Sequence, residues 1–515
     1  MNLFLQYLQH GHPLGYDGPT SSRWSENLLS IQHDPLTAAQ KIHKEVTKGR
    51  IAGPFDSISD TGNPSLIISP IGLVPKSTGG FRLIHHLSHP WGGGINAYID
   101  DDICKVSYGK FDDATRILTK FGRHATMAKL DVESAYRLLS MRTADFRFLG
   151  FQFRGKVFYD KMAPMGAKIS ASHWERFGAL WDWLVNDIPG FTGATVRYLD
   201  DLLVIFPGHH SDPHQSFSHI KALCADIGLP LAEAKLIPPA PEVQFLGLTL
   251  DARTQTISIP QEKLEKAQHH ISATLRKRRV KVRHLLSTAG LLSFLTKALP
   301  AGRAFLRRLF DAIRGKPKHF WIPVSTDIKS DLRTWAAFLD SYNGTTPFPA
   351  LRARSSDDIH LFTDASLSGF GIVFHKHWAF GHFPTFPDPQ PSMTWREFFP
   401  ILIAVHLFGH SLSNTKICFV TDNMGVYHIL SSLSCVSPDI MDLVRPFILQ
   451  CLKINLIFSS AFTPSKCNTL ADPLSRNLLQ VFRERAKGMD REPTVISASL
   501  LLRFGRKKPS SSAPR

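Results

Sequence analysis

The densest group of chemically informative residues in the sequence is an acidic pair inside an apolar stretch. Asp200 and Asp201 lie in VRYLDDLLVIF, between two segments with the composition of β-strands. This pattern predicts a β-hairpin with two carboxylates at its tip. Adjacent carboxylates between such hydrophobic strands repel one another unless a cation lies against them. Mg²⁺ prefers oxygen ligands of this kind, and the alternative interpretation is an exposed acidic turn.

A third aspartate extends the pattern. Asp131 in ATMAKLDVESAY follows a strand-like run, so its carboxylate is expected at the end of a strand. Carboxylates on neighbouring strands of one sheet can hold two metal ions about 4 Å apart, which is the arrangement for in-line phosphoryl transfer. The three aspartates are therefore predicted to bind two Mg²⁺ ions, with Mn²⁺ as an alternative.

Four further acids occur in order near the end of the chain. Asp364 lies in a predicted strand, Glu397 opens a predicted helix, Asp422 ends the strand ICFVTD, and Asp472 stands near a helix start. Helical spacing places Glu397 on the same face as the apolar stripe of its helix. A carboxylate that points into a core requires a cation or a proton, so this group is a second candidate metal site.

The elements that must position these acids are of two kinds. From residue 65 to 251, strand-like runs alternate with helical stretches at 169–185 and 212–228, which predicts an α+β body with a mostly antiparallel sheet. From residue 261 to 340, helical periodicity replaces the strand signals. After a stretch rich in Pro, Ser, Thr and Gly, strands and helices alternate again, as in a small α/β domain.

Composition favours a polyanionic partner. The chain of 515 residues has 60 Lys+Arg against 43 Asp+Glu, a formal net charge of +17, and its hydrophobic content of 43% is sufficient for folded cores. The basic run at 276–283 is expected to follow a phosphate backbone, although a solvated face is the ordinary alternative. The six cysteines form no CxxC pair, so neither a disulfide framework nor a zinc knuckle is expected.

Several motifs together resemble the reverse transcriptases. YLDD, LDVESAY, the APMG loop at 163–166 and FLGLTLD at 245–251 occur in the order of the right-hand polymerase motifs of that family. The segment ISPIGLVPKSTGGFRLIHHLS resembles the fingers hairpin of such enzymes. The resemblance covers residues 60–340 and implies fingers, palm and a helical thumb or connection, with Asp131, Asp200 and Asp201 as catalytic metal ligands.

The resemblance also implies five contacts to the incoming nucleotide. Lys76 and Arg82 would grip the triphosphate, and Tyr136 would exclude a ribose 2′-hydroxyl. Gly166 would let the backbone approach the template base pair, and Lys235 would protonate the leaving pyrophosphate. The residues alone allow plainer interpretations, namely a solvated hairpin, core packing, an ordinary turn and a solvated lysine.

The four later acids resemble the carboxylate set of the ribonuclease H fold. That resemblance implies that Asp364, Glu397, Asp422 and Asp472 bind two Mg²⁺ ions and cut the RNA strand of an RNA–DNA hybrid. Related domains often carry a histidine ten residues before the last acid, whereas this sequence has Phe462 there. This difference from related domains implies an effect on the turnover of RNA cleavage rather than on the fold.

These observations predict the following organisation. We expect an N-terminal arm (1–60), fingers and palm (61–255), a helical thumb or connection (256–340), a linker (341–357), a ribonuclease H-like α/β domain (358–480) and a disordered basic tail (481–515). The segments SPIGLVPK, HPWGGGIN and LADPLSR are most similar to segments in the polymerases of tyrosine-recombinase retrotransposons of the DIRS or Ngaro type.

The predicted function is RNA-directed DNA synthesis combined with ribonuclease H activity. The expected partners are an RNA template, a DNA primer, their hybrid, dNTPs, and the element's recombinase and capsid-like proteins, with no membrane partner. No apolar run approaches the length of a membrane span, and the N-terminus lacks the features of a secretory signal, so an intracellular location, cytoplasmic or nuclear, is expected. The alternatives are a domesticated, non-catalytic nucleic-acid-binding protein and a viral RNA-directed RNA polymerase.

Overall fold

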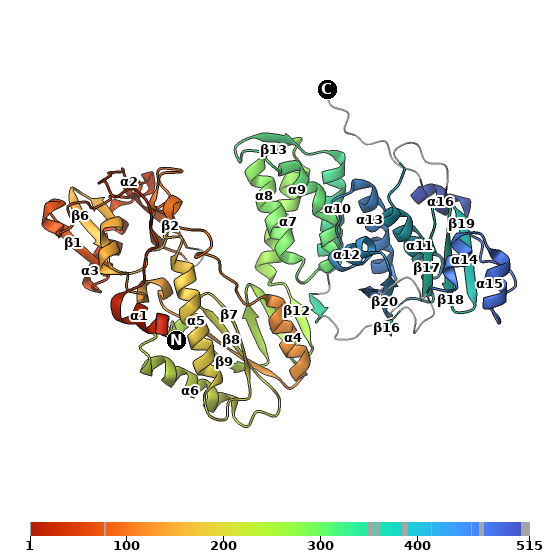
Figure 1. Ribbon diagram of the computed structural model, residues 1–515, viewed down its shortest axis with the longest axis horizontal. Helices are drawn as coiled ribbons and strands as arrows, with labels where there is room; N and C mark the ends of the chain where they lie inside the picture. The colour runs from red at the N-terminus through yellow and green to blue at the C-terminus, as the bar shows by residue number, and fades with distance from the viewer. Residues whose placement is uncertain are drawn as a thin grey trace. The chain divides into compact units, whose positions relative to one another are not determined.

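The chain folds into two compact units. Unit 1 comprises Met1–Leu246 and Leu250–Gln255, and unit 2 comprises Gly247–Thr249 and Thr256–Arg515. The structure is a computed structural model (Figure 1) that describes residues 2–76, 79–342, 344–348, 354–355, 361–383, 390–413, 415–454, 456–462 and 468–505. The unit boundary falls close to residue 255, where the sequence predicts the end of the α+β body.

Unit 1 is built on the antiparallel sheet that the sequence predicts. The sheet has the order β7-β8-β4-β9, with strands at Ala194–Tyr198, Asp201–Phe206, Thr126–Asp131 and Ile237–Ala240. The residues of β8 after Asp201 are all buried, which explains why this strand reads as a continuous apolar run. Helices α4 (Phe111–Phe121), α5 (Ser170–Asn186) and α6 (Pro213–Asp226) pack on this sheet (Figure 1).

A second layer of unit 1 surrounds a β-hairpin. Strands β2 (Ile71–Pro75) and β3 (Phe81–His85) pair antiparallel, as predicted for the segment that contains Lys76 and Arg82. The N-terminal helices α1 (Asn2–His10), α2 (Leu29–His33) and α3 (Pro35–Thr47) belong to the same unit, and α3 packs against β1 and β3. A three-stranded sheet completes the layer, with the order β1 (Ile51–Phe55), β6 (Lys156–Asp160) and β5 (Gly150–Phe153).

The first part of unit 2 is helical, with one exception to the prediction. Its helices are α7 (Gln261–Leu275), α8 (Val282–Leu295), α9 (Arg307–Ile313) and α10 (Thr326–Asp340). The basic run is not helical throughout, because β13 (Arg279–Lys281) pairs with β14 (Trp321–Pro323). Sequence periodicity did not reveal this hairpin, since its two strands have three residues each and lie far apart in the chain.

The second part of unit 2 has the predicted α/β character. Strands β17 (Leu361–Ala365), β18 (Gly369–Phe374) and β19 (His377–His382) form an antiparallel sheet, and α11 (Met393–Leu407) packs on it. Strand β20 (Lys416–Thr421) pairs in parallel with β21 (Ile457–Phe462) and with the short β16 (Arg354–Ser355). Helices α12 (Met424–Ser432) and α13 (Pro438–Lys453) form the crossover, and α14 (Ala471–Ser475) and α15 (Leu479–Arg485) follow β21.

The two parts of unit 2 are packed together. Helix α13 contacts the 3₁₀ helix η6 (Pro300–Phe305), and the buried Asp331 of α10 forms ion pairs with Arg308 at 3.0 Å and with Arg445 of α13 at 3.6 Å. Within the predicted linker, β15 (Thr345–Pro347) pairs with β12 (Thr256–Ser258). Residues 343, 349–353 and 356–357 of that linker lie outside the described part of the chain.

The expectation of a disordered tail from residue 481 is wrong for its first part. Helix α15 continues to Arg485, with Phe482 fully buried against Trp378, and α16 spans Ala498–Gly505. The aromatic residues of this segment bury apolar surface, which favours an ordered structure. The basic composition of the segment gave no indication of this burial. Residues 506–515 lie outside the described residues.

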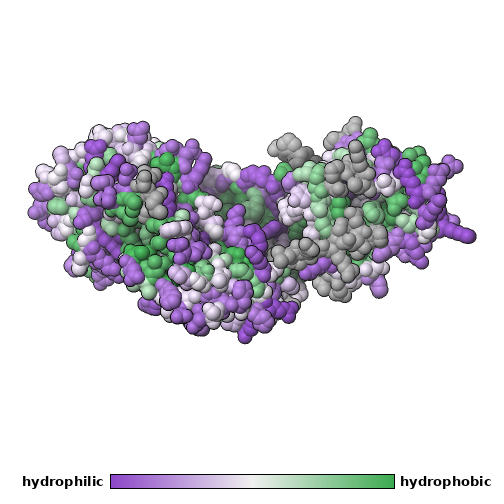
Figure 2. Space-filling view, turned by 60° about the horizontal axis from the view of Figure 1, so that its bottom comes forward, coloured by the Kyte–Doolittle hydropathy of each residue, from purple (hydrophilic) through white to green (hydrophobic). Residues whose placement is uncertain are grey.

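The described helices include none that is long and apolar enough to cross a membrane. On the face shown in Figure 2, hydrophilic residues predominate, and hydrophobic residues form separate patches. This surface agrees with the basic, polar composition of the chain.

Candidate active sites

The first carboxylate site, which consists of Asp131, Asp200 and Asp201, lies at one end of the sheet of unit 1. Strands β4 and β8 are antiparallel, and their last matched pair is Asp131 with Asp201. Strands β7 and β8 form the predicted hairpin, in which Tyr198 is paired with Asp201, so that Leu199 and Asp200 form the two-residue turn. The register therefore brings together three acids that are up to 70 residues apart in the sequence.

Two hydrogen bonds hold this turn against the sheet. The indole Nε1 of Trp174 donates to the carbonyl of Leu199 at 2.9 Å, and the amide of Val132 donates to the carbonyl of Asp200 at 3.0 Å. Leu199 has a φ of +53°, a left-handed conformation that is unfavourable for a branched side chain. Strained backbone of this kind persists only where its surroundings enforce it, and it concentrates at functional sites.

Two lysines lie against the carboxylates. The Nζ of Lys235 is 2.9 Å from both carboxylate oxygens of Asp131, and the Nζ of Lys129 is 3.0 Å from Asp201. Lys129 precedes Asp131 by two residues, so both side chains are on the same face of β4. The pairing of Lys235 with Asp131 agrees with its expected place near the reacting groups, whereas the role of Lys129 was not predicted, although its spacing was a usable signal.

The electrostatics of this site favour a bound cation. Burial, followed by the charge of Asp131, raises the pKa of Asp200, and burial together with both neighbouring acids raises the pKa of Asp201 despite Lys129. Oxygen ligands under such repulsion suit Mg²⁺. Among the described residues, no group of three or more His, Cys, Asp or Glu side chains is arranged to hold a metal ion.

A cavity of about 710 Å³ opens beside these carboxylates. We call it the central cavity. Its lining includes Asp131 and Asp200 together with all five residues predicted to contact a nucleotide, namely Lys76, Arg82, Tyr136, Gly166 and Lys235. Residues from the β2–β3 hairpin, the chain after β4, the 163–166 loop and the segment before β9 thus converge on one space, although they are dispersed in the sequence.

Tyr136 lines the central cavity, and the charges of both Asp200 and Arg82 act on its hydroxyl. It belongs to the 3₁₀ helix η3 (Ala135–Leu138), which follows Ser134 in a left-handed conformation with a φ of +61°. Burial, then the phenol of Tyr108 and the charge of Asp200, raises the pKa of Tyr136 to about 12. Its hydroxyl therefore stays protonated, and the ring is a fixed neutral wall of the central cavity.

Gly166 is required by the fold itself. Its φ is +131°, and a Cβ atom at this position would lie 1.9 Å from the carbonyl oxygen of His85. The amide of His85 donates to the carbonyl of Met165, and Asn96 donates to the carbonyl of Gly166 at 2.7 Å. The close approach to β3 explains the glycine, and its predicted contact with the template stays a prediction.

Sequence reasoning missed the contribution of helix α3 to the central cavity. Lys41, Lys44 and Glu45 of this helix line the cavity. Glu45 accepts a 2.9 Å hydrogen bond from Arg137, the residue after Tyr136, and Arg137 also pairs with the buried Asp160 at 2.7 Å. Nothing local in the sequence indicated that these side chains would line the cavity.

The second carboxylate site, which consists of Asp364, Glu397, Asp422 and Asp472, lies in unit 2. Asp364 is in β17, Glu397 is in the first turns of α11, Asp422 follows β20, and Asp472 is in α14, as the sequence predicts. Burial raises the pKa of Glu397 to about 9, with further contributions from Asp364 and Asp422. Burial, with Asp472 and Asp422, raises the pKa of Asp364 to about 6. The four acids therefore influence one another, and a divalent cation would relieve their repulsion.

Two hydrogen bonds from α14 and its C-terminal end hold members of this second site. The Oγ of Ser475 donates to Asp364 at 2.6 Å, and the Nε of Arg476 donates to Asp472 at 2.8 Å. Neither partner was predicted from the sequence. Both follow Asp472 within four residues, so the helical spacing after the last acid was the available signal.

Phe462 is not a core residue. It ends β21, is matched with Thr421 next to Asp422, and has 46% of its surface exposed. Phe462 is therefore accessible to solvent at the end of its strand. Residues 463–467, the rest of the stretch in which the sequence departs from related domains, lie outside the described part of the chain.

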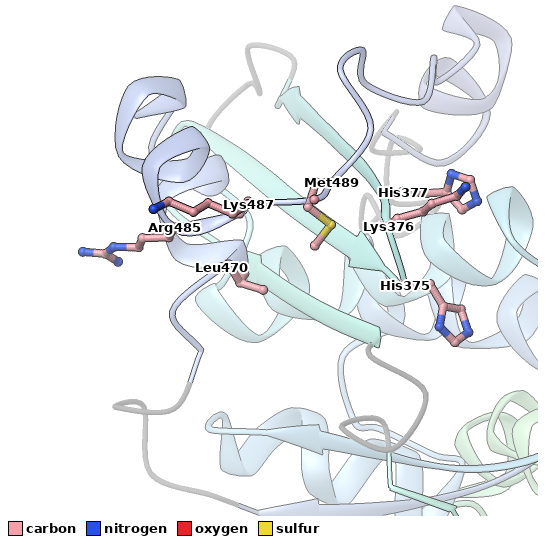
Figure 3. A pocket seen from close by; sticks show the side chains of 9 residues that line it. His375, Lys376, His377, Leu470, Arg485, Lys487 and Met489 are labelled. Atoms are coloured by element: carbon pink, nitrogen blue, oxygen red, sulfur yellow. The ribbon is translucent and has the colours of Figure 1, made fainter.

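A further pocket of about 650 Å³ lies in the same α/β part (Figure 3). It is lined by His375, Lys376, His377, Leu470, Arg485, Ala486, Lys487, Gly488 and Met489. His375 follows the end of β18 that is paired with Leu361, whereas Asp364 is paired with Gly371 further along the hairpin. This basic pocket is thus separate from the second carboxylate site.

Part of the sequence matches the model of one protein family. Residues 74–250 match the model of the family described as reverse transcriptase (RNA-dependent DNA polymerase). The matched range includes Lys76, Arg82 and all three acids of the first carboxylate site.

The curated relatives are retrotransposon polyproteins. The Tf2-3 and Tf2-4 transposon polyproteins of Schizosaccharomyces pombe are each 23% identical over 467 residues, which is 87% of this chain. The chain spans about a third of their length, since the match covers 31% of each polyprotein.

Solved structures of foamy viral protease-reverse transcriptase are similar in fold. One of these structures is the foamy viral protease-reverse transcriptase dRH in complex with double-stranded DNA. It has a TM-score of 0.51 at 15% identity, and the match covers 87% of this chain and 72% of that chain. The complex with an RNA/DNA hybrid has a TM-score of 0.50 at 14% identity and covers 99% of this chain and 62% of that one. At such identities the likeness shows the right-hand polymerase fold.

Proposed function

We propose that this chain, which contains a reverse transcriptase domain with the right-hand polymerase fold, is an RNA-directed DNA polymerase. The observation that carries the proposal is the central cavity, whose lining includes the acids Asp131 and Asp200, the cations Lys76 and Arg82, and Tyr136. A cavity lined by both acids and cations suits a nucleoside triphosphate whose α-phosphate reacts and whose other phosphates are held.

In this proposal the chain's own residues have distinct tasks. Lys76 and Arg82 hold the triphosphate, Tyr136 fills the space that a 2′-hydroxyl needs, and the three aspartates hold Mg²⁺. The metal ions, when bound, would activate the primer 3′-hydroxyl and neutralise charge on the leaving group. Lys235, whose Nζ is 2.9 Å from both carboxylate oxygens of Asp131, lines the same cavity and would donate a proton to the leaving pyrophosphate.

We propose in addition that the second carboxylate site cuts the RNA strand of an RNA–DNA hybrid. The support is that Asp364 and Glu397 are buried near the other acids of this site. Burial, and after it the charges of neighbouring acids, raises the pKa of both groups. These acids would hold Mg²⁺, which activates water for attack on a phosphodiester. In this order of strands and helices, the α/β part would be a ribonuclease H-like domain.

The proposed substrates are an RNA template, a DNA primer and the hybrid formed from them, in an intracellular location. The basic residues of unit 2 supply phosphate contacts without sequence readout. Arg279 and Lys281 on β13 are members of such a surface, and the ammonium of Lys281 lies 5.5 Å from the ring centre of the exposed Trp321. Recombinase and capsid-like partners would be encoded by the same element.

We also propose that the chain originates from a tyrosine-recombinase element. This proposal rests only on the similarity of the segments SPIGLVPK, HPWGGGIN and LADPLSR to such elements. The matching curated proteins are Tf2 polyproteins, so the two origins differ in what the neighbouring DNA encodes. Sequencing the genomic flanks tests this proposal. A tyrosine recombinase frame beside the gene is expected, and an integrase frame in its place would contradict the DIRS or Ngaro assignment.

One labelled substrate tests both proposed activities. The full chain is incubated with dNTPs and Mg²⁺ on an RNA template that carries a DNA primer, with both strands labelled. We expect primer extension together with shortening of the RNA. Binding without either reaction would favour a non-catalytic nucleic-acid-binding protein, and incorporation of UTP in preference to dTTP would favour an RNA polymerase.

A further inference from the structure

Helix α3 presents one charged face to the central cavity. Lys41, Lys44, Glu45 and Lys48 follow at helical spacing and share a side of the helix. Two of them form ion pairs with residues that follow β4. Glu45 pairs with Arg137 at 2.9 Å, and Lys48 pairs with Glu133 at 3.6 Å. These ion pairs fix the direction in which the face points.

The other two residues have no such partner. Within the described part of the chain, neither Lys41 nor Lys44 forms an ion pair or a side-chain hydrogen bond, and both line the central cavity. Glu45, the acid beside them, is shared between Arg137 and Arg50. Among the described residues, Lys41 and Lys44 thus line the cavity without an ion-pair partner of their own.

The cations of the cavity act on one another. Burial lowers the pKa of Lys76, and the charges of Lys41, Arg82, Lys235 and Lys44 lower it further. Positive groups from three separate elements therefore share one electrostatic field. Such concentrated repulsion is relieved by a compact polyanion more effectively than by isolated phosphates spaced along a strand.

We propose that Lys41 and Lys44 bind the β- and γ-phosphates of the incoming nucleotide and the pyrophosphate formed from them. The inference rests on the proposed polymerase function. In that reaction the primer 3′-oxygen forms a bond to the α-phosphorus, the bond from this phosphorus to the bridging oxygen breaks, and pyrophosphate leaves with the electron pair. The same two phosphates are thus bound before and after the step, and helix α3 becomes part of the nucleotide site.

Steady-state kinetics on poly(rA) primed with oligo(dT) test the inference. The double variant Lys41→Gln/Lys44→Gln is compared with wild type, with the double arginine variant, and with Lys120→Gln, which removes an exposed lysine on α4 outside the cavity. We expect the KM for dTTP and the inhibition constant for added pyrophosphate to rise together by about tenfold, with kcat changed less. The arginine variant should recover most of the affinity, and Lys120→Gln should behave as wild type.

The outcomes separate the inference from the function on which it rests. If wild type does not extend the primer, the proposed function is contradicted. If wild type is active but the double glutamine variant keeps the KM for dTTP and the inhibition by pyrophosphate, only the inference fails. A weaker affinity for the primer–template with unchanged nucleotide kinetics would assign these lysines to the nucleic-acid backbone and would overturn the proposal.

Discussion

The environments of individual side chains decide what each acid in this chain can do. Asp131 is 5% exposed and engaged by Lys235, whereas Asp200 stands on a strained turn with its pKa raised by burial and by Asp131. The sequence indicated the acids and their hairpin because an acidic pair between apolar strands is unusual. It could not indicate the pairing of Lys235 with Asp131, which depends on a fold that brings together residues 104 positions apart.

At Tyr136 we predict a change in sugar selectivity. Replacement of Tyr136 by alanine opens the wall of the central cavity where a 2′-hydroxyl would lie, so discrimination against ribonucleotides should fall by about tenfold or more. Single-nucleotide extension with dTTP and UTP measures the ratio of kcat/KM values. An unchanged ratio would show that the ring only packs against its neighbours.

At Phe462 we predict a gain in turnover without a loss of stability. Because 46% of Phe462 is exposed, beside the strand that leads to Asp422, the imidazole of Phe462→His would remain in contact with water. A histidine there can exchange protons and contact phosphate, which phenylalanine cannot. Multiple-turnover hybrid cleavage should rise by about tenfold at most, since release-limited gains are small, while the single-turnover rate stays the same.

The structural arm of that experiment is thermal melting of the full chain. The melting temperature of Phe462→His should equal that of wild type. A lowered melting temperature without a gain in turnover would show that the exposed ring stabilises the domain and that hybrid cleavage does not need the histidine.

At the level of elements, helices and strands with strong local signals could be predicted from the sequence. Elements that depend on contacts distant in the sequence could not. Helix α3 begins at Pro35 after the cap Asp34, whose side chain accepts from the amide of Thr37 at 3.1 Å, and an aspartate followed by a proline is a local signal for a helix start. The β13–β14 hairpin and the helices after residue 480 escaped prediction. In each of these cases, contacts distant in sequence outweigh local composition.

The docking of the N-terminal segment should depend on pH. His173 of α5 is buried, and its Nε2 lies 2.7 Å from the carbonyl oxygen of Pro13. Burial, with the nearby His12 and Arg176, lowers the pKa of His173 to about 4 from a usual 6.5. Below pH 6.5 the unfolded chain therefore binds a proton at His173. The folded chain binds this proton only near pH 4. Stability is full above pH 6.5 and is lost as the pH falls toward 4.

At pH 5 this single group should cost about 2 kcal/mol of stability relative to pH 7. Hydrogen exchange of the His12 and Arg142 amides, which bond to Ser140 and His12 respectively, reports on this docking. We expect faster exchange at pH 5 after correction for intrinsic rates, and a weaker pH dependence in His173→Gln. The exposed His43→Gln serves as the matched control, and equal pH dependence in all three proteins would contradict the assignment.

At the scale of the whole molecule, the chain forms two compact units and carries a carboxylate site in each. Asp331, 1% exposed, joins α10 to α13 through Arg445, so the helical part and the α/β part of unit 2 share a buried ionic contact. The predicted division at residues 341–357 stays a prediction. Composition alone marks a Pro- and Ser-rich stretch as a boundary, but it carries no information on the packing of the elements on either side.

Because the two sites lie in different units, their activities should be separable. Asp364→Asn and Glu397→Gln should each lower RNA cleavage by about 10²-fold or more through loss of a proposed metal ligand. DNA synthesis should stay near the wild-type rate. Extension and cleavage are followed on the same labelled hybrid, and parallel loss of both activities from either change would indicate one interdependent unit.

The most direct test of the central claim is DNA synthesis by Asp200→Asn on an RNA template, measured beside its affinity for the same primer–template. The substitution keeps the shape of the turn and removes the carboxylate, while the phosphate contacts that hold the nucleic acid are made elsewhere. We expect the rate of dTTP incorporation to fall by about 10³-fold or more with a dissociation constant within about twofold of wild type. Synthesis at the wild-type rate would contradict the assignment of the first carboxylate site as the polymerase centre.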